Sequence, residues 1–174
     1  MIRQAIDTTP IKELRETFYD VFDSPLGALT VSTDGSCITG LHIAGDRHFT
    51  AVPDHWVKDS SHSLLQEAKA QLEAYFAGTR TAFDLPIAYL GTPFQVAVWD
   101  ALRDIPYGAT TTYAAIAAST GKPDAVRAVG SAVGRNPLCI ILPCHRVLDS
   151  DGALGGYVAG LECKEKLLAL ERQR

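Results

Sequence analysis

The sequence lacks long hydrophobic runs and has few cysteines, and each absence excludes a class of protein. No stretch approaches the roughly 20 consecutive apolar residues of a membrane-spanning helix. The start, MIRQAIDTTP, lacks the apolar segment of a secretory signal. We therefore expect a cytoplasmic protein with no membrane association. The four cysteines, at irregular spacings in 174 residues, are more typical of free thiols than of a disulfide framework.

Paired metal-ligand spacings are also absent. Cys37, His42, His48, His55 and His62 all fall in the first half of the chain, but no C-x-x-C or H-x-x-x-H spacing links them. Structural zinc sites normally show such pairs. We therefore interpret these residues as loop and surface residues and expect neither a metal ion nor a cofactor.

Positive charge is not in excess, since the net charge is -4. This value argues against a protein that coats nucleic acid non-specifically. Residues 1–90 contain 7 Lys and Arg against 12 Asp and Glu, whereas residues 91–174 contain 9 against 8. Any nucleic-acid surface should therefore be a local patch on the second half.

The first half shows the alternation and turn chemistry of a small β-meander followed by a helix. The turns SPLG and TDGS separate three expected strands, near 17–23, 27–33 and 36–43. A loop is expected over 44–60, and 79–91 could supply another edge strand. Between them, Ser63 and Gln66 fit a capping box that starts a helix, which Gly78 ends.

The second half has the pattern of several short helices. Thr92, Pro93 and Gln95 predict the start of one helix through a second capping box. The segment TTYAAIAASTGKPDAVRAVGSAVGRN then predicts two helices joined by a short turn that contains Gly121, the pattern of a helix-turn-helix. A last helix is expected from about Leu161.

The second helix of this pair has one apolar stripe and one nearly bare face. Residues 125, 128, 129, 132 and 133 recur at core-facing spacing. The other side carries Arg127, Gly130, Ser131 and Gly134. Glycine within a helix costs about 1 kcal/mol relative to alanine, which close approach to DNA would explain. An ordinary, tightly packed helix pair is the alternative, and the single long cation fits minor-groove docking better than base-edge reading.

Cys144 and His145 are adjacent within the apolar segment IILPCHRVL. A thiol with an ordinary pKa needs a base or a positive neighbour to become a nucleophile, and His145 could be that base. A third group should then orient the histidine, and the C-terminal helix offers Glu162, Glu165 and Glu171. The pattern also predicts a short strand that ends at Cys144. Taken alone, the pair fits a buried core cysteine beside a surface histidine better than a nucleophile and its base.

Taken together, the motifs resemble the O6-alkylguanine-DNA alkyltransferase family, over most of residues 89–171. The resemblance is carried by GTPFQVAVWDALRDIPYGATTTYAAIA, AVRAVGSAVGRNP, IILPCHRVL, GALGGY and LLALE, in that order. It implies an α+β fold with two domains. Residues 1–88 would form a small antiparallel three-stranded sheet with a helix, ribonuclease H-like in type. Residues 89–174 would form a helical domain with a winged-helix-like helix-turn-helix.

The resemblance also implies roles for the residues of the reaction. Cys144 would accept the alkyl group in a single in-line displacement, after His145 deprotonates it through a water molecule. Glu171 would orient His145, Tyr113 would protonate or hydrogen-bond the leaving guanine, and Asn136 would tie the turn to the cysteine-bearing segment.

Further roles concern DNA and the base. Arg127 would fill the gap left by the flipped nucleotide, and Tyr157, Val158 and Ala159 would wall the base pocket. Backbone groups of Cys144 and Val147 would read the guanine edge. The other residues expected at the DNA surface are Ala125, Ala128, Gly130, Ser131 and Arg135.

The expected function is therefore stoichiometric repair of O6-alkylguanine in double-stranded DNA by a monomer that binds the minor groove. Two alternatives remain open at this stage. One is a binding-only lesion sensor, a class that lacks the reactive cysteine. The other is a helix-turn-helix regulator that reads DNA sequence and is indifferent to alkylation.

Overall fold

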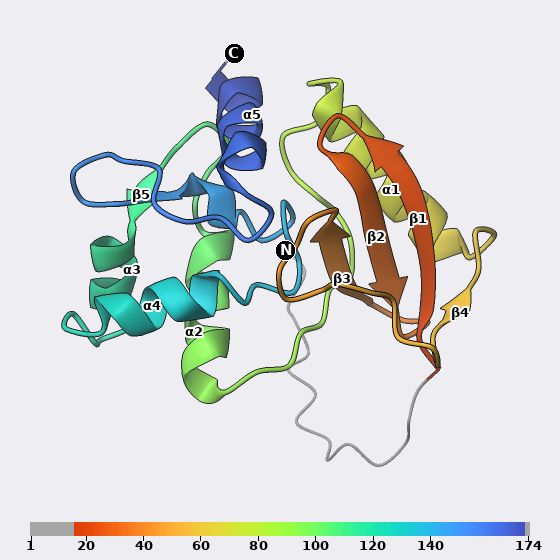
Figure 1. Cartoon of the computed structure of the whole chain (residues 1–174), viewed down its shortest axis with the longest axis horizontal. Coiled ribbons are helices and arrows are strands. Elements are labelled where there is room, and N and C mark those ends of the chain that lie inside the picture. The colour runs from red at the N-terminus through yellow and green to blue at the C-terminus, as the bar shows by residue number, and fades with distance from the viewer. Residues whose placement is uncertain (1–15, 173–174) are drawn as a thin grey trace.

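A small β-sheet lies beside a group of helices in the computed structural model, which describes residues 16–172 (Figure 1). The sheet has the strand order β3-β2-β1-β4. The three predicted strands are confirmed, and they form an antiparallel meander. The fourth is a two-residue strand, within the stretch expected to be loop, that pairs in parallel with β1. The strands are β1 (Phe18–Ser24), β2 (Gly27–Thr33), β3 (Ile38–Ile43) and β4 (Val57–Lys58).

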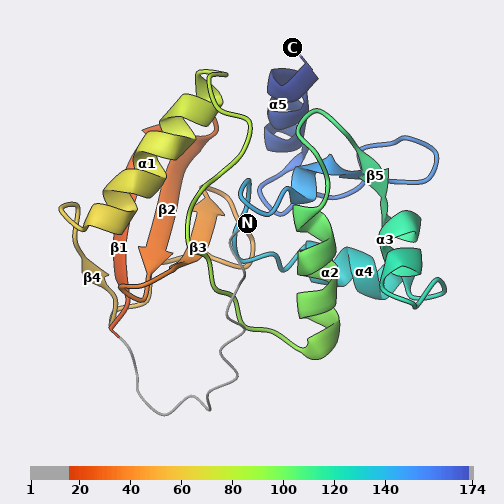
Figure 2. The ribbon, with the colours of Figure 1, turned by 180° about the vertical axis from the view of Figure 1, so that it is seen from behind.

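Helix α1 (Ser63–Phe76) covers one face of this sheet (Figure 2). The helix buries Leu65, Ala68, Leu72 and Tyr75, and Gly78 follows it with a φ of 70°. The predicted cap at Ser63 is wrong by one residue. His62 is the N-cap, because its ring Nδ1 accepts a hydrogen bond from the backbone N–H of Leu64 at 3.2 Å.

The prediction of an edge strand within 79–91 is wrong, since this segment makes only one isolated bridge, between Ile87 and Ile38. The backbone N–H of Ile38 donates to Pro86, and that of Ala88 donates to Ile38. The segment therefore covers part of the exposed edge of β3 without forming a regular strand.

The second half of the described chain contains four α-helices and a short two-stranded parallel sheet. The capping box at Thr92 is confirmed: Thr92 Oγ1 accepts from the Gln95 N–H, and the Gln95 side chain accepts from the Thr92 N–H. The helices are α2 (Pro93–Arg103), α3 (Tyr113–Ser119), α4 (Val126–Val133) and α5 (Leu161–Arg172), and the strands are β5 (Thr111–Thr112) and β6 (Val147–Leu148).

The expected helix-turn-helix is confirmed as α3 and α4, which pack against each other and against α2. Val129, Ala132 and Val133 face the core, as predicted. The assignment of Ala128 to this buried stripe is wrong, because Ala128 is exposed. Trp99 on α2 fixes α4 by donating its indole N–H to the Ala132 carbonyl at 2.9 Å.

The two halves meet along the edge of β3. The backbone N–H of Leu41 donates to the Pro137 carbonyl at 2.9 Å, and that of Cys139 donates to the Leu41 carbonyl at 3.1 Å. The chain that leads toward Cys144 is thereby added to the sheet. Because both partners are backbone groups in the interior, this pairing also satisfies donors and acceptors that would otherwise be buried without partners.

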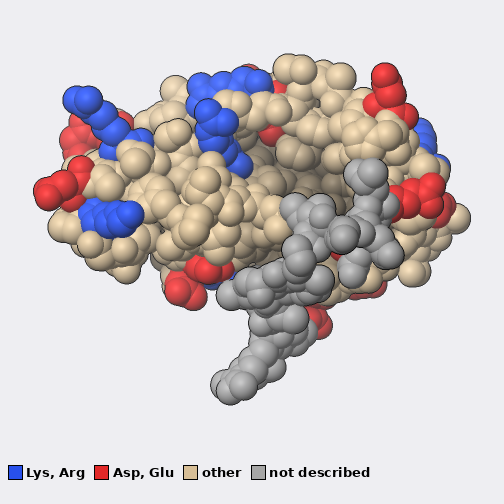
Figure 3. All heavy atoms as spheres, turned by 90° about the horizontal axis from the view of Figure 1, so that it is seen from below, with Lys and Arg blue, Asp and Glu red and all other residues tan. Residues whose placement is uncertain are grey.

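On the face seen from below, Lys and Arg side chains form separate patches on a largely uncharged surface over the helical half (Figure 3). None of the helices within residues 16–172 combines the length and the apolar character needed to cross a bilayer.

Replacement of Gly91 and of Gly130 by alanine should have opposite effects on the stability of the fold. A Cβ at Gly91 would lie 2.6 Å from the buried Trp99 ring, whereas a Cβ at Gly130 would meet nothing within 4 Å. Gly91→Ala should therefore lower the free energy of unfolding by about 1–3 kcal/mol. Gly130→Ala should leave it unchanged or raise it by up to about 1 kcal/mol, because alanine favours the helix. Urea unfolding measures both; equal stability of the two variants would contradict the packing at Trp99.

Candidate functional site

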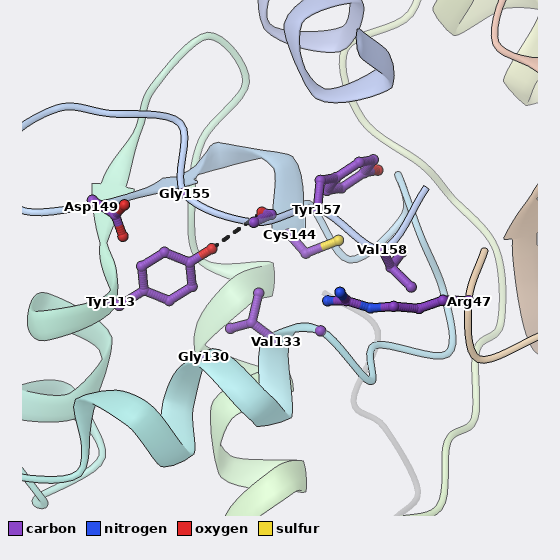
Figure 4. A pocket seen from close by; sticks show the side chains of 11 residues that line it. Arg47, Tyr113, Gly130, Val133, Cys144, Asp149, Gly155, Tyr157 and Val158 are labelled. Atoms are coloured by element: carbon purple, nitrogen blue, oxygen red, sulfur yellow. Dashed lines mark hydrogen bonds between the residues drawn. The ribbon is translucent and has the colours of Figure 1, made fainter. Parts of the chain in front are cut away.

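A cavity of about 430 Å³ opens beside Cys144. We call it the Cys144 pocket. Helix α4 and the loop 149–158 form most of its wall, and α3 contributes Tyr113 at one end (Figure 4). The sheet half contributes one residue, Arg47, from the loop after β3. The pocket is thus built mainly by the helical half and is completed across the boundary between the halves.

Cys144 lies in a single turn of 3₁₀ helix, Cys144–Arg146, and is 2% exposed. The prediction of a strand that ends at Cys144 is wrong, since the short strand β6 comes after the turn. Side chains in a 3₁₀ helix point about 120° apart. Cys144 therefore lines the pocket, whereas His145 is fully buried in the interior.

Asn136 holds the chain that precedes this turn. Its Nδ2 donates to the Leu142 carbonyl at 2.8 Å, and its Oδ1 accepts from the Leu138 N–H at 2.9 Å. Between these contacts, Ile140 has a φ of 73°. The left-handed region is strained for a β-branched residue and persists only where the surroundings impose it. Asn136 and the pairing with β3 are the contacts that impose it here.

His145 is held by Glu171, with Nε2 at 2.8 Å from Oε1. A carboxylate only accepts hydrogen bonds, so Nε2 carries the proton and Nδ1 of the neutral ring is an acceptor. Burial lowers the pKa of His145, and the opposing effect of Glu171 does not overcome it. The ring is therefore neutral at pH 7. Nδ1 is buried and has no hydrogen-bond partner within residues 16–172.

Glu171 is a buried carboxylate that four groups share. Arg146 donates from Nε and Nη2, each at 2.9 Å, Tyr75 donates from its hydroxyl at 2.6 Å, and the Gly108 N–H donates at 3.3 Å. Burial alone would raise the pKa of Glu171, but the hydrogen bonds from His145 and Arg146 lower it far below the ordinary value. Glu171 therefore stays ionised. Glu162 and Glu165, the other candidates on α5, are exposed.

The pKa of Cys144 is lowered, chiefly by a hydrogen bond from the Cys139 thiol. Burial opposes this effect, and the positive charge of Lys164 supports it. The same interaction, together with burial, raises the pKa of Cys139. Cys144 therefore ionises first, and Cys139 remains a thiol that can donate to the thiolate.

Lys164 is fully buried and fixes the pocket wall. Its Nζ donates to the carbonyls of Val147 at 2.6 Å and Gly156 at 3.1 Å, and also to that of Leu154. The Tyr113 hydroxyl donates to the same Gly156 carbonyl at 3.4 Å (Figure 4). Burial, with Asp149 nearby, raises the pKa of Tyr113 to about 12, so its hydroxyl keeps its proton at pH 7.

Of the five expected reaction residues, Cys144 and Tyr113 line the pocket. Asn136 holds the chain that leads to Cys144, and Glu171 holds His145 in the interior. Of the residues expected around the base, Tyr113, Cys144, Tyr157 and Val158 line the pocket, whereas Val147 and Ala159 are not part of its described wall. On α4 and its flanks, Gly130 lines the pocket and Ala125 is half-buried. The exposed members of the expected DNA surface are Arg127, Ala128, Ser131 and Arg135.

Sequence reasoning missed Arg146, Lys164, Tyr75, Cys139 and Arg47. Helical spacing could have found Lys164, because it lies on the buried face of α5 that also carries Glu171, seven residues later. Arg146 directly follows His145. Tyr75 and Arg47 act on segments distant in sequence, and Cys139 reaches Cys144 only through the irregular backbone between them, so no local pattern marks these three.

Two of the four histidines of the first half, His42 and His62, have structural roles. The His42 ring stacks on Phe49 and contacts Asp46 at 3.0 Å, and His62 caps α1. Within the described residues, no group of three or more His, Cys, Asp or Glu side chains could hold a metal ion.

Replacing Cys139 tests the electrostatics of the thiol pair. Cys139→Ala removes the donor to the Cys144 sulfur and should raise the pKa of Cys144, so that its alkylation by iodoacetamide at pH 7 slows by up to about tenfold for each unit of pKa. Peptide-resolved mass spectrometry across pH measures this rate. Cys163→Ala, on α5, is the matched control and should leave the Cys144 profile unchanged. An unshifted profile in Cys139→Ala would remove Cys139 from the account of the reactive thiol.

Two family models match the chain, and together they cover most of it. The DNA binding domain of 6-O-methylguanine DNA methyltransferase matches residues 93–173, and the ribonuclease-like domain of the same protein matches residues 17–89. Each match falls on one half of the described fold.

Similar proteins agree with these models. The methylated-DNA–protein-cysteine methyltransferase of Methanosarcina acetivorans is 46% identical over 88% of this chain and 97% of its own length. That of Mycobacterium tuberculosis is 45% identical over 90% and 93%. The crystal structure of Mycobacterium tuberculosis OGT in complex with DNA has a TM-score of 0.84 at 44% identity, covering 89% of this chain and 92% of that chain. This chain belongs to the 6-O-methylguanine DNA methyltransferase family.

Proposed function

We propose that this protein repairs DNA by transferring the alkyl group of O6-alkylguanine to its own Cys144. The observation that carries the proposal is the position of Cys144. Its sulfur faces a pocket, its pKa is lowered, and the neutral, buried His145 follows it in the same turn. The named relatives are methyltransferases whose acceptor is a protein cysteine.

The first chemical step is loss of the Cys144 proton. Since no direct hydrogen bond joins Cys144 and His145 within the described residues, the proton passes to His145 Nδ1 through a water molecule. Glu171 holds Nε2–H and stabilises the imidazolium that forms. Cys139 and Lys164 stabilise the thiolate.

The thiolate then attacks the alkyl carbon in line with the bond to guanine O6. The new S–C bond forms as the C–O6 bond breaks, and the electron pair of that bond goes to guanine. Tyr113 remains protonated at pH 7 and donates to the leaving base. The proton that His145 took from the thiol then passes through water to Tyr113 and restores its hydroxyl, so that guanine gains one proton in all and no cofactor is consumed. The product at Cys144 is a thioether, which has no leaving group, so each molecule acts once.

The target nucleotide must leave the duplex to reach the pocket, at a cost of a few kcal/mol. Residues of helix α4 can stabilise the duplex after the nucleotide has left it. Arg127 is exposed and can fill the gap in the base stack, while the small side chains of Ala128 and Ser131 let the helix approach the DNA closely. Docking in the minor groove fits this face, because it offers few long polar side chains for base edges.

The proposal includes a division into an N-terminal domain, 1–88, and a DNA-binding, alkyl-accepting domain, 89–174. We also propose that the protein is a monomer in solution and is located in the cytoplasm. The free thiols at Cys139, Cys144 and Cys163 support that location, because free thiols are typical of a reducing compartment.

Incubation with a duplex that contains O6-methylguanine should add the mass of one methyl group to the intact protein, once per molecule. Tryptic mapping should locate it on Cys144. Cys144→Ser, which preserves the shape of the site, should bind the duplex without gaining mass. Binding by the wild type without mass gain would instead indicate a lesion sensor. Sequence-selective binding indifferent to the lesion would indicate a regulator.

Glu171→Gln should slow methyl transfer by about 10²-fold or more. The amide can donate to Nε2, which favours the tautomer with a proton on Nδ1, and that tautomer cannot accept the Cys144 proton. Single-turnover rates against pH measure the effect. Glu162→Gln, on the exposed side of the same helix, should transfer at the wild-type rate.

The pH dependence of stability distinguishes the loss of the orienting role of Glu171 from misfolding of the variant. Glu171 has a pKa below its ordinary 4.5 in the folded state, so its ionisation stabilises the fold above pH 4.5 and this contribution is lost as the pH falls through the lowered value. Glu171→Gln should lack that loss while remaining folded at pH 7. A folded variant that transfers at the wild-type rate would rule out the orienting role.

A further inference from the structure

Arg47 is the positively charged residue of the Cys144 pocket, and the proposed mechanism does not use it. It lies in the loop after β3, in the sheet half, yet it lines the pocket beside Cys144, Val133 and Val158. Its guanidinium points into the space beneath the Cys144 sulfur (Figure 4). The backbone N–H of Arg47 donates to the Val158 carbonyl at 3.4 Å, which ties this loop to the pocket wall.

The charge of Arg47 has no ion-pair partner within residues 16–172. The neighbouring carboxylate, Asp46, is engaged elsewhere: it contacts the His42 ring at 3.0 Å and accepts from the His48 N–H at 2.8 Å. The other carboxylate at the pocket, Asp149, lies at the opposite end, beside Tyr113 (Figure 4). The pocket is therefore positive at the end that holds the sulfur and negative at the far end.

The order of residues along the pocket indicates what would face Arg47. If guanine lies between Tyr113 and Cys144, its O6 substituent points toward the sulfur. In-line attack requires the sulfur, the alkyl carbon and O6 to be collinear. The remaining substituents of that carbon must then extend sideways, along the wall formed by Val133, Val158 and Arg47.

A methyl group cannot accept a hydrogen bond from a guanidinium, whereas a carboxylate on the attacked carbon would accept hydrogen bonds from it. Guanidinium and carboxylate match in shape and charge, and such pairs are among the stronger hydrogen bonds in proteins. The pairing also has a kinetic consequence. A carboxylate next to the reacting carbon repels the incoming Cys144 thiolate, and a neighbouring cation offsets that repulsion in the transition state.

We infer that Arg47 forms a subsite for O6-alkyl groups that carry a carboxylate, of which carboxymethyl is the smallest. The inference rests on the proposed function and specifies its substrate class. In the reaction, the S–CH₂ bond forms, the CH₂–O6 bond breaks, and guanine receives the electron pair and a proton from Tyr113. The product is S-carboxymethylcysteine, with its carboxylate on Arg47. Arg47 is thus a specificity-determining residue.

The test uses three duplexes that differ only at the lesion: O6-methylguanine, O6-carboxymethylguanine and O6-carbamoylmethylguanine. The last replaces the carboxylate by a neutral amide of the same size. Single-turnover transfer rates are measured for the wild type, Arg47→Gln, Arg47→Lys and Arg47→Glu. Arg80→Gln, an arginine of the sheet half outside the pocket, is the matched control.

Arg47→Gln should lower the carboxymethyl rate by about tenfold, the size expected for one charge-assisted hydrogen bond. The methyl and carbamoylmethyl rates should stay within about twofold of the wild type. Arg47→Lys should retain most of the carboxymethyl rate, and Arg47→Glu should lower it further than Gln does. Because Arg47 is exposed, the preference should also weaken as salt increases.

The outcomes separate this inference from the proposed function. Equal loss on all three duplexes would overturn the subsite and assign Arg47 to the DNA backbone or to folding, which thermal unfolding of the variants distinguishes. An unchanged carboxymethyl rate in Arg47→Gln and Arg47→Glu would also overturn it. If the wild type transfers no methyl group, the proposed function itself fails, whatever Arg47 does.

Discussion

The buried carboxylate of Glu171 is the interaction on which the rest of the site depends. An ionised group removed from water is tolerated only when it is fully paired, and here Arg146, His145, Tyr75 and Gly108 all donate to it. The donors come from three parts of the chain: His145 and Arg146 from the 3₁₀ turn, Gly108 from the loop after α2, and Tyr75 from α1 in the sheet half. The requirement to pair one charge therefore orients His145 and joins the two halves of the molecule at the same point.

The reactive cysteine is held by irregular backbone. Ile140 adopts a left-handed conformation that a β-branched residue rarely takes, and the contacts of Asn136 and the pairing of Leu41 with the segment around Leu138 maintain it. Strain of this kind costs about 1–3 kcal/mol and is typical of functional sites. The conformation places the Cys139 thiol where it can donate to the Cys144 sulfur, which a regular strand would not do.

Two positively charged side chains lie near the Cys144 sulfur, one buried and one exposed to solvent. Lys164 is buried and has a double role: it fixes the loop that carries Gly156, and its charge favours the thiolate. Arg47 lies in the pocket itself and is exposed to solvent. A buried cation acts on every substrate alike because it never meets the substrate, whereas a cation in the pocket acts on the part of the substrate that touches it. Reactivity and specificity can therefore be altered separately.

The sequence by itself determined the elements whose signals are local. The capping box at Thr92, the meander and the helix-turn-helix are each marked by residues close together in the sequence. The alkyltransferase motif around Cys144 pointed to Glu171 as well. Only the tertiary structure decided the 3₁₀ turn at Cys144, because distant contacts impose its strain. The same holds for Tyr75, which bonds Glu171 across 96 residues, and for Arg47. Periodicity reports which face of an element is apolar; which residues of two elements meet depends on how those faces pack.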